Sequence, residues 1–107
     1  MSRISDVIDR LAAVVESRRS ADPASSWSAR LLADRPLAAK KLAEEAVELA
    51  LAAALRDRSA VVAESADLIY HWLVLLAASG VTLDEVAGAL EAREGRSGVE
   101  EKAAREP

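Results

Sequence analysis

The stretch "AEEAVELALAAALRDRSAVVAESAD", residues 43–67, decides the fold. Apolar residues recur every three or four positions on both sides of the polar segment Arg56–Ser59, which is the spacing of one face of an α-helix. Two helices joined by so short a connection pack antiparallel. We therefore expect a helical hairpin, with a first long helix from Pro36 to about residue 55 and a second, capped by Ser59, that ends at Gly80.

Shorter helices are expected on both sides of this hairpin. The apolar spacing near the N-terminus predicts a helix over about residues 5–18. Ser26 is a helix N-cap candidate for a short segment that carries Trp27, and Thr82–Glu85 has the pattern of a capping box, which opens a helix to about residue 93. Strand alternation is missing throughout. The fold class is therefore all-α, a helical bundle of about four to five helices with two long antiparallel ones.

Composition predicts a small core and self-association. The chain has 107 residues, of which 51% are hydrophobic, but it has no Phe and many of its apolar residues are Ala. Each buried position then removes little apolar area from water, so we expect further burial in a homodimer. We assign residues 1–93 to one all-α domain and the charged residues 94–107 to a C-terminal tail.

Charge and residue usage exclude several classes of function. The net charge of −4 gives no basic patch for nucleic acid. The chain has no Cys, hence no disulfide or thiolate zinc site. No uninterrupted apolar run reaches the roughly 18 residues that span a bilayer, and the N-terminus is unlike a signal peptide. We expect a cytoplasmic protein with neither a nucleic-acid nor a membrane partner.

Acidic residues interrupt the apolar stripe of the first long helix. Glu44 and Glu48 are spaced in line with Leu51 and Leu55, and Glu45 lies one helical turn before Glu48. We expect this line of residues to face the second long helix.

The second long helix carries acids at the matching place. Glu64 begins a stripe that continues through Leu68 and His71, and Asp67 lies at its edge. Antiparallel packing would bring these acids opposite those of the first helix. Crowded carboxylates are unstable when removed from water, so they need protons or a cation. Oxygen ligands without Cys select a hard cation, Mg²⁺ with Mn²⁺ as an alternative, and Mg²⁺ shares its ligand shell with phosphate. The simpler interpretation is a solvated acidic face.

Five further side chains are candidates for substrate binding: Trp27, Arg30, Lys40, Lys41 and His71. The basic residues would contact phosphate and the indole would stack on a base, while the imidazole would hold a carboxylate or a substrate oxygen. For each of them a structural role is the alternative, namely an ion pair for a lysine, packing for the indole and a core hydrogen bond for the imidazole.

The spacing Lys41-x-x-Glu44-Glu45-x-x-Glu48, followed by Glu64-x-x-Asp67 and Tyr70-His71, resembles the all-α nucleoside-triphosphate pyrophosphohydrolase superfamily, whose members are called MazG-like. Within this superfamily the chain is most similar to the phosphoribosyl-ATP pyrophosphohydrolase family. The longer stretches that carry this similarity are residues 26–32, 40–53, 64–86 and 93–105.

The resemblance implies a Mg²⁺-dependent, nucleotide-binding hydrolase that converts phosphoribosyl-ATP to phosphoribosyl-AMP and pyrophosphate in histidine biosynthesis. It also implies an intertwined homodimer with its active sites near the subunit interface. Carried over by position, the metal ligands would be Glu45, Glu48, Glu64 and Asp67. Glu44 would be a further ligand or would orient the attacking water, and Glu44 or Glu45 would accept its proton.

Two other functions remain open from the sequence. A house-cleaning hydrolase of the same superfamily would act on free NTPs or dNTPs with the same acids. A non-enzymatic helical interaction module would use the acids only to repel wrong partners.

Overall fold

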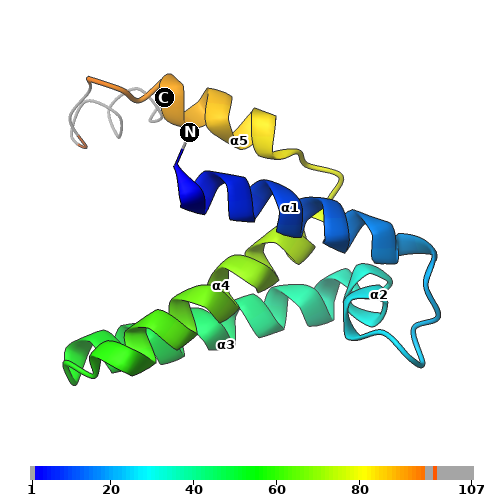
Figure 1. Ribbon diagram of the computed structural model, residues 1–107, viewed down its shortest axis with the longest axis horizontal. Coiled ribbons are helices and arrows are strands. Elements are labelled where there is room, and N and C mark those ends of the chain that lie inside the picture. The colour runs from blue at the N-terminus through cyan, green and yellow to red at the C-terminus, as the bar shows by residue number, and fades with distance from the viewer. Residues whose placement is uncertain (1, 96–97, 99–107) are drawn as a thin grey trace, which may run out of the picture.

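The computed structural model describes residues 2–95 and Gly98, and in that part of the chain every element is a helix (Figure 1). The predicted all-α class is confirmed. The elements are α1 (Arg3–Ser17), the 3₁₀ turn η1 (Arg18–Ser20), α2 (Trp27–Leu32), α3 (Arg35–Ala54), α4 (Arg58–Ala78) and α5 (Leu83–Glu91). The predicted tail, residues 94–107, lies almost wholly outside the described residues, and the domain boundary before it stays a prediction.

α3 and α4 form the predicted antiparallel hairpin, the most extensive packing of any two elements described (Figure 1). The least exposed stripe of α3 is Ala38, Leu42, Glu45, Leu49 and Ala52. This stripe lies one residue beyond the predicted line, so the expectation that Leu51 and Leu55 face α4 is wrong: they are 58% and 79% exposed. The physical reason is that α3 has Ala or Leu on several faces, so more than one face could pack on α4. The face with alanine is the one that packs, because alanine lets the helix axes approach closely.

The connection between the two long helices ends two residues earlier than expected. Arg56 has a positive φ of 56°, which reverses the chain, and the Asp57 side chain accepts the backbone N–H of Ala60. Asp57 therefore caps α4, and the predicted cap at Ser59 is wrong. A carboxylate is favoured here because it also meets the positive end of the helix dipole.

Three other predicted helix ends are confirmed, whereas the ends of α1 and α3 and the C-terminus of α5 lie one or two residues from the predicted positions. Gly80 has φ 70° after the end of α4, and the N–H of Val81 reaches back to the carbonyl of Leu76 at 3.0 Å, as in a Schellman motif. Thr82 and Glu85 exchange hydrogen bonds of 3.1 and 2.7 Å, completing the capping box of α5. Ser26 caps α2 by accepting the N–H of Ala29.

The core is small and lies at the end of the hairpin away from its connection. Val15, Leu31, Ala38 and Val74 meet there, one from each of the first four α-helices. α1 contacts the C-terminal part of α4, and from this contact the two helices diverge toward their N-termini (Figure 1). The space between them is an apolar groove of about 420 Å³, lined by Ile4, Val7, Ile8, Leu11, Val61, Val62, Ser65, Ala66 and Ile69. The single chain thus leaves much apolar surface uncovered.

α4 is also long and apolar enough, by length and composition alone, to cross a membrane. Its best 18-residue window has a mean hydropathy of 1.5, and 17% of that window is buried. The core helix of a soluble protein passes the same test, so this finding is weak evidence. The expectation that the protein has no membrane partner stays a prediction.

The cap of α4 gives a test of the hairpin. Replacing Asp57 with Ala removes the acceptor for the Ala60 N–H and should lower the free energy of unfolding by about 1 kcal/mol. Ser59→Ala, two residues further on, should cost clearly less because Ser59 caps no backbone group. Urea denaturation at one fixed protein concentration measures both. Equal losses would mean that Asp57 is not the cap.

Candidate metal centre

Three carboxylates from two helices meet on the hairpin. Glu45 and Glu48 of α3 and Glu64 of α4 each place one oxygen within 4.8 Å of the others. Antiparallel pairing explains the meeting, because Glu48 precedes the Arg56 turn by eight residues and Glu64 follows it by eight. The predicted convergence of these three acids is therefore present. We call them the acidic group.

Two oxygens of the acidic group lack a partner. Glu45 Oε2 and Glu64 Oε2 are buried and accept no hydrogen bond from the protein. A carboxylate oxygen hidden from water without a donor is destabilising. Either a proton or a ligand that supplies positive charge would relieve this unfavourable arrangement.

Mutual repulsion perturbs the titration of two members of the acidic group. Hydrogen-bonding contact with the Glu64 carboxyl, and then its charge, raise the pKa of Glu48 above its ordinary value. Contact with Glu45, followed by burial, raises the pKa of Glu64. Both shifts mean that the fully ionised group is unfavourable unless a cation is present.

The donor chemistry of the acidic group fits a hard divalent cation. All three side chains offer oxygen, the two unpartnered oxygens come from opposite helices, and the chain has no thiolate. Oxygen ligands of this kind bind Mg²⁺, Mn²⁺ or Ca²⁺ rather than Zn²⁺. The residues present thus form a possible metal-binding group.

Asp67 is next to the acidic group but is not a member of it. It is exposed, three residues after Glu64 on α4, and its charge contributes to raising the pKa of Glu64, after the larger effects of Glu45 and burial. Its role as a fourth metal ligand stays a prediction.

Glu44 is engaged by lysines. Lys41 Nζ lies 3.3 Å from Glu44 Oε2, and Lys40 Nζ lies 4.0 Å from Glu44 Oε1. Glu44 is one residue off the inner stripe of α3 and is not a member of the acidic group. Its predicted catalytic role, like that of Glu45, stays a prediction.

Three of the candidate substrate-binding residues come together beside Glu44. The Arg30 guanidinium lies 5.5 Å from the centre of the Trp27 ring, and Lys41 Nζ lies 6.0 Å from it. Trp27 and Arg30 belong to α2 and Lys41 to α3, so only the packing of these two helices joins them. No spacing in the sequence signals this contact.

His71 has the geometry of the structural alternative. Its side chain is 9% exposed, Nδ1 donates to the main-chain carbonyl of Asp67 at 2.8 Å, and the ring packs edge-on against Tyr70. The Tyr70 hydroxyl in turn bonds to Ser28 Oγ, which ties α4 to α2. Contact of His71 with substrate stays a prediction.

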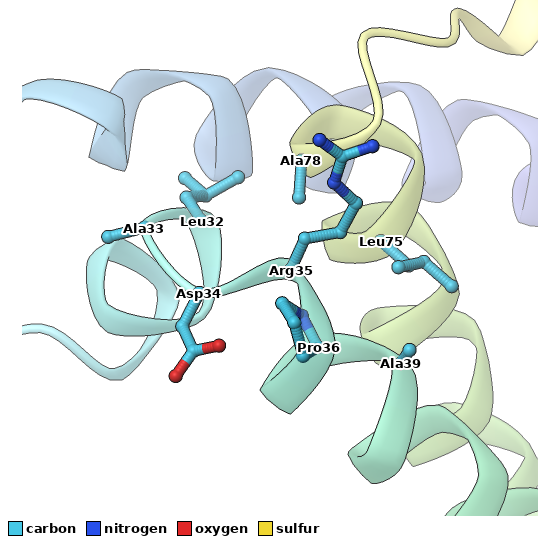
Figure 2. Close-up of a pocket in the computed structure, with 8 residues that line it drawn as sticks. All are labelled: Leu32, Ala33, Asp34, Arg35, Pro36, Ala39, Leu75 and Ala78. Atoms are coloured by element: carbon cyan, nitrogen blue, oxygen red, sulfur yellow. The ribbon is translucent and has the colours of Figure 1, made fainter.

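A separate cavity lies elsewhere in the described residues. It measures about 680 Å³ and opens where α2 meets α3, near the end of α4, lined by Leu32, Ala33, Asp34, Arg35, Pro36, Ala39, Leu75 and Ala78 (Figure 2). No member of the acidic group lines this cavity, and the nearest pair on α3, Ala39 and Glu45, are six residues apart, about 9 Å along the helix. This cavity is therefore separate from the acidic group.

Comparison with known proteins connects the chain to a family. The family model for phosphoribosyl-ATP pyrophosphohydrolase matches residues 8–94. A phosphoribosyl-ATP pyrophosphatase of Caulobacter vibrioides is 60% identical over 103 residues, covering 96% of each chain. A relative of the same name in Cereibacter sphaeroides is 56% identical, and the match covers 92% of this chain and 97% of the relative. Another, in Parvibaculum lavamentivorans, is also 56% identical, and the match covers 92% of this chain and 91% of the relative.

The raised pKa values make a prediction about stability without metal. A carboxyl whose pKa is raised by folding contributes stability below its unfolded pKa, and this contribution is lost as pH rises through the folded value. Glu64→Gln should therefore raise the melting temperature of the metal-free protein at pH 7, with the gain shrinking as pH falls toward 4.5.

Glu16 is the matched control for this measurement. Hydrogen bonding from Arg19 lowers the pKa of Glu16, so Glu16→Gln should not stabilise the protein at pH 7. Thermal melts in EDTA from pH 4 to pH 8 test both variants. A Glu64→Gln protein that is less stable than the wild type at pH 7 contradicts the crowding argument.

Proposed function

The chain belongs to the phosphoribosyl-ATP pyrophosphohydrolase family, and on this premise we propose that it hydrolyses phosphoribosyl-ATP to phosphoribosyl-AMP and pyrophosphate. This reaction is the second step of histidine biosynthesis, and we propose a cytoplasmic location for the protein. The structural observation that supports the proposal best is the acidic group with its two unpartnered buried oxygens.

We propose that Glu45, Glu48 and Glu64 hold Mg²⁺, for which Mn²⁺ is an alternative, and that Asp67 completes the ligand set. Bound Mg²⁺ would neutralise phosphate charge and lower the pKa of a water molecule. The three oxygens within 4.8 Å of one another support this assignment, as does the position of Asp67 one turn after Glu64.

The chain's own residues then align and deprotonate the water. The water oxygen forms a bond to a phosphorus of the anhydride between the AMP and pyrophosphate groups. The bond from that phosphorus to the bridging oxygen breaks, which releases phosphoribosyl-AMP and pyrophosphate. Glu45 would accept the proton through the carboxylate oxygen that does not bind the metal. Lys41, within 3.3 Å of Glu44 and beside the acidic group, supplies positive charge to the phosphate oxygens.

We further propose that the protein acts as a homodimer. The groove between α1 and α4 is almost entirely apolar, and exposed side chains such as Val62, 66% accessible, line it. An uncovered apolar surface of this kind is typical of a subunit interface. A second copy that inserts a helix between the diverging helices would cover the groove and interlock the two chains.

The activity has a direct test. Purified protein with Mg²⁺ should release pyrophosphate from phosphoribosyl-ATP, and Glu48→Gln or Asp67→Asn should lower kcat at least about a hundredfold because a ligand is lost. Glu16→Gln, on the surface of α1, should leave turnover unchanged. Coupled pyrophosphate detection measures the rates. Full turnover by either variant removes that residue from the ligand set.

The same assay separates the alternatives. Preference for free NTPs or dNTPs over phosphoribosyl-ATP indicates a house-cleaning hydrolase. An interaction module predicts no turnover and no rise in melting temperature with Mg²⁺, whereas metal bound to the folded state raises it.

The dimer has a separate test. Val62→Lys places a charge in the apolar groove and should weaken self-association at least about tenfold, since a buried unpaired charge is unfavourable in an interface. Leu90→Lys, at an exposed position of α5 outside the groove, is the control. Sedimentation equilibrium gives both masses. An unchanged dimer in Val62→Lys places the interface elsewhere.

A further inference from the structure

Trp27 is an exposed indole with two cations over it. It is 42% exposed at the first position of α2, and Arg30 and Lys41 lie 5.5 and 6.0 Å from its ring centre. A cation over an indole face is stabilised by the ring quadrupole. The ring therefore holds two positive side chains from different helices close together, although their charges repel.

Lys41 is held more firmly than its neighbour Lys40. Its side chain is 32% exposed, against 70% for Lys40, and it lies between the Trp27 ring and the Glu44 carboxylate. A lysine normally loses considerable side-chain entropy when it binds an anion. Contacts on two sides reduce that cost in advance, so Lys41 is preorganised.

The basic residues of this cluster outnumber its acid. Arg30, Lys40 and Lys41 carry three positive charges and Glu44 one negative charge, which leaves a net charge of about +2. Lys41 is four residues from Glu45 on α3, about 6 Å along the helix. A single extended anion can therefore contact the cationic cluster and a metal held by the acidic group.

We propose that Trp27, Arg30 and Lys41 form a subsite for a phosphate group of the substrate, and that Glu44 positions Lys41 and neither binds the metal nor accepts the proton. This inference rests on the proposed hydrolase function. Phosphate is favoured over a nucleobase because the two cations already lie over the indole. Glu44 is assigned to positioning because its two oxygens face lysines and because it is outside the acidic group.

A double-mutant cycle tests the role of Glu44. Lys41→Met keeps the aliphatic chain without its charge and should raise KM for phosphoribosyl-ATP about tenfold or more, the effect of a lost charge-assisted contact. Glu44→Gln should raise KM about three- to tenfold with kcat nearly unchanged. In the Lys41→Met background, Glu44→Gln should have almost no further effect, because Glu44 acts through Lys41.

Two results would overturn the role of Glu44. If Glu44 is a ligand or the base, Glu44→Gln lowers kcat about a hundredfold or more in both backgrounds. An unchanged KM in Glu44→Gln, or in Lys41→Met, also contradicts the proposal. Glu16→Gln, which breaks a comparable ion pair three residues apart on α1, is the control and should change neither constant.

Binding of an inert anion tests the subsite without turnover. Isothermal titration calorimetry with inorganic tripolyphosphate in EDTA should show binding that weakens about tenfold in Arg30→Met and in Lys41→Met, and also weakens in Trp27→Leu. Circular dichroism verifies that each variant is folded. If the wild type binds tripolyphosphate but does not hydrolyse phosphoribosyl-ATP, the proposed function fails while the subsite stands. If all variants bind tripolyphosphate as the wild type does, the subsite is wrong.

Discussion

Close antiparallel packing of α3 on α4 is the constraint on which the rest of the structure depends. Ala38 and Ala52 on the inner stripe of α3 are small and buried, and at these two positions they let the helices approach closely. The same approach sets the register that places Glu48 opposite Glu64 across the turn at Arg56. A bulky residue in place of Ala38 or Ala52 would push the two helices apart and would separate the carboxylates that they carry.

The stability lost at the acidic group is recovered elsewhere. Ionised Glu45, Glu48 and Glu64 repel one another, and burial of two of their oxygens adds to the unfavourable free energy. The core, at the end of the hairpin away from its connection, contains only small or medium apolar side chains. Its burial therefore offsets only part of the unfavourable free energy of the acidic group. In the function we propose, a bound cation and a second subunit supply the remainder, and both couple folding to the state in which the enzyme acts.

Glu44 and Glu45 are neighbours on α3 but face different surroundings. They are adjacent in the sequence, yet one lies on the inner stripe beside Glu64 and the other turns toward Lys40 and Lys41. The result is an arrangement with negative charge at the acidic group and net positive charge around Trp27. This arrangement suits a phosphate substrate, because the acidic group would hold a metal ion that binds the substrate and Lys41 would contact the substrate directly.

The sequence alone predicted the all-α class and the hairpin through its apolar spacing, and the helix ends at Ser26, Gly80 and Thr82–Glu85 through local caps. It predicted the family by resemblance, through the spacing of its acids and the longer matching stretches. It also determined that Glu45, Glu48 and Glu64 would converge, since antiparallel pairing follows from a short connection. Tertiary structure alone decided the inner stripe of α3, because alanine and leucine on several of its faces leave the packing face ambiguous in the sequence. It also decided the contact between Trp27 and Lys41, which depends on how α2 packs against α3, a matter of three-dimensional shape that no spacing along the chain encodes.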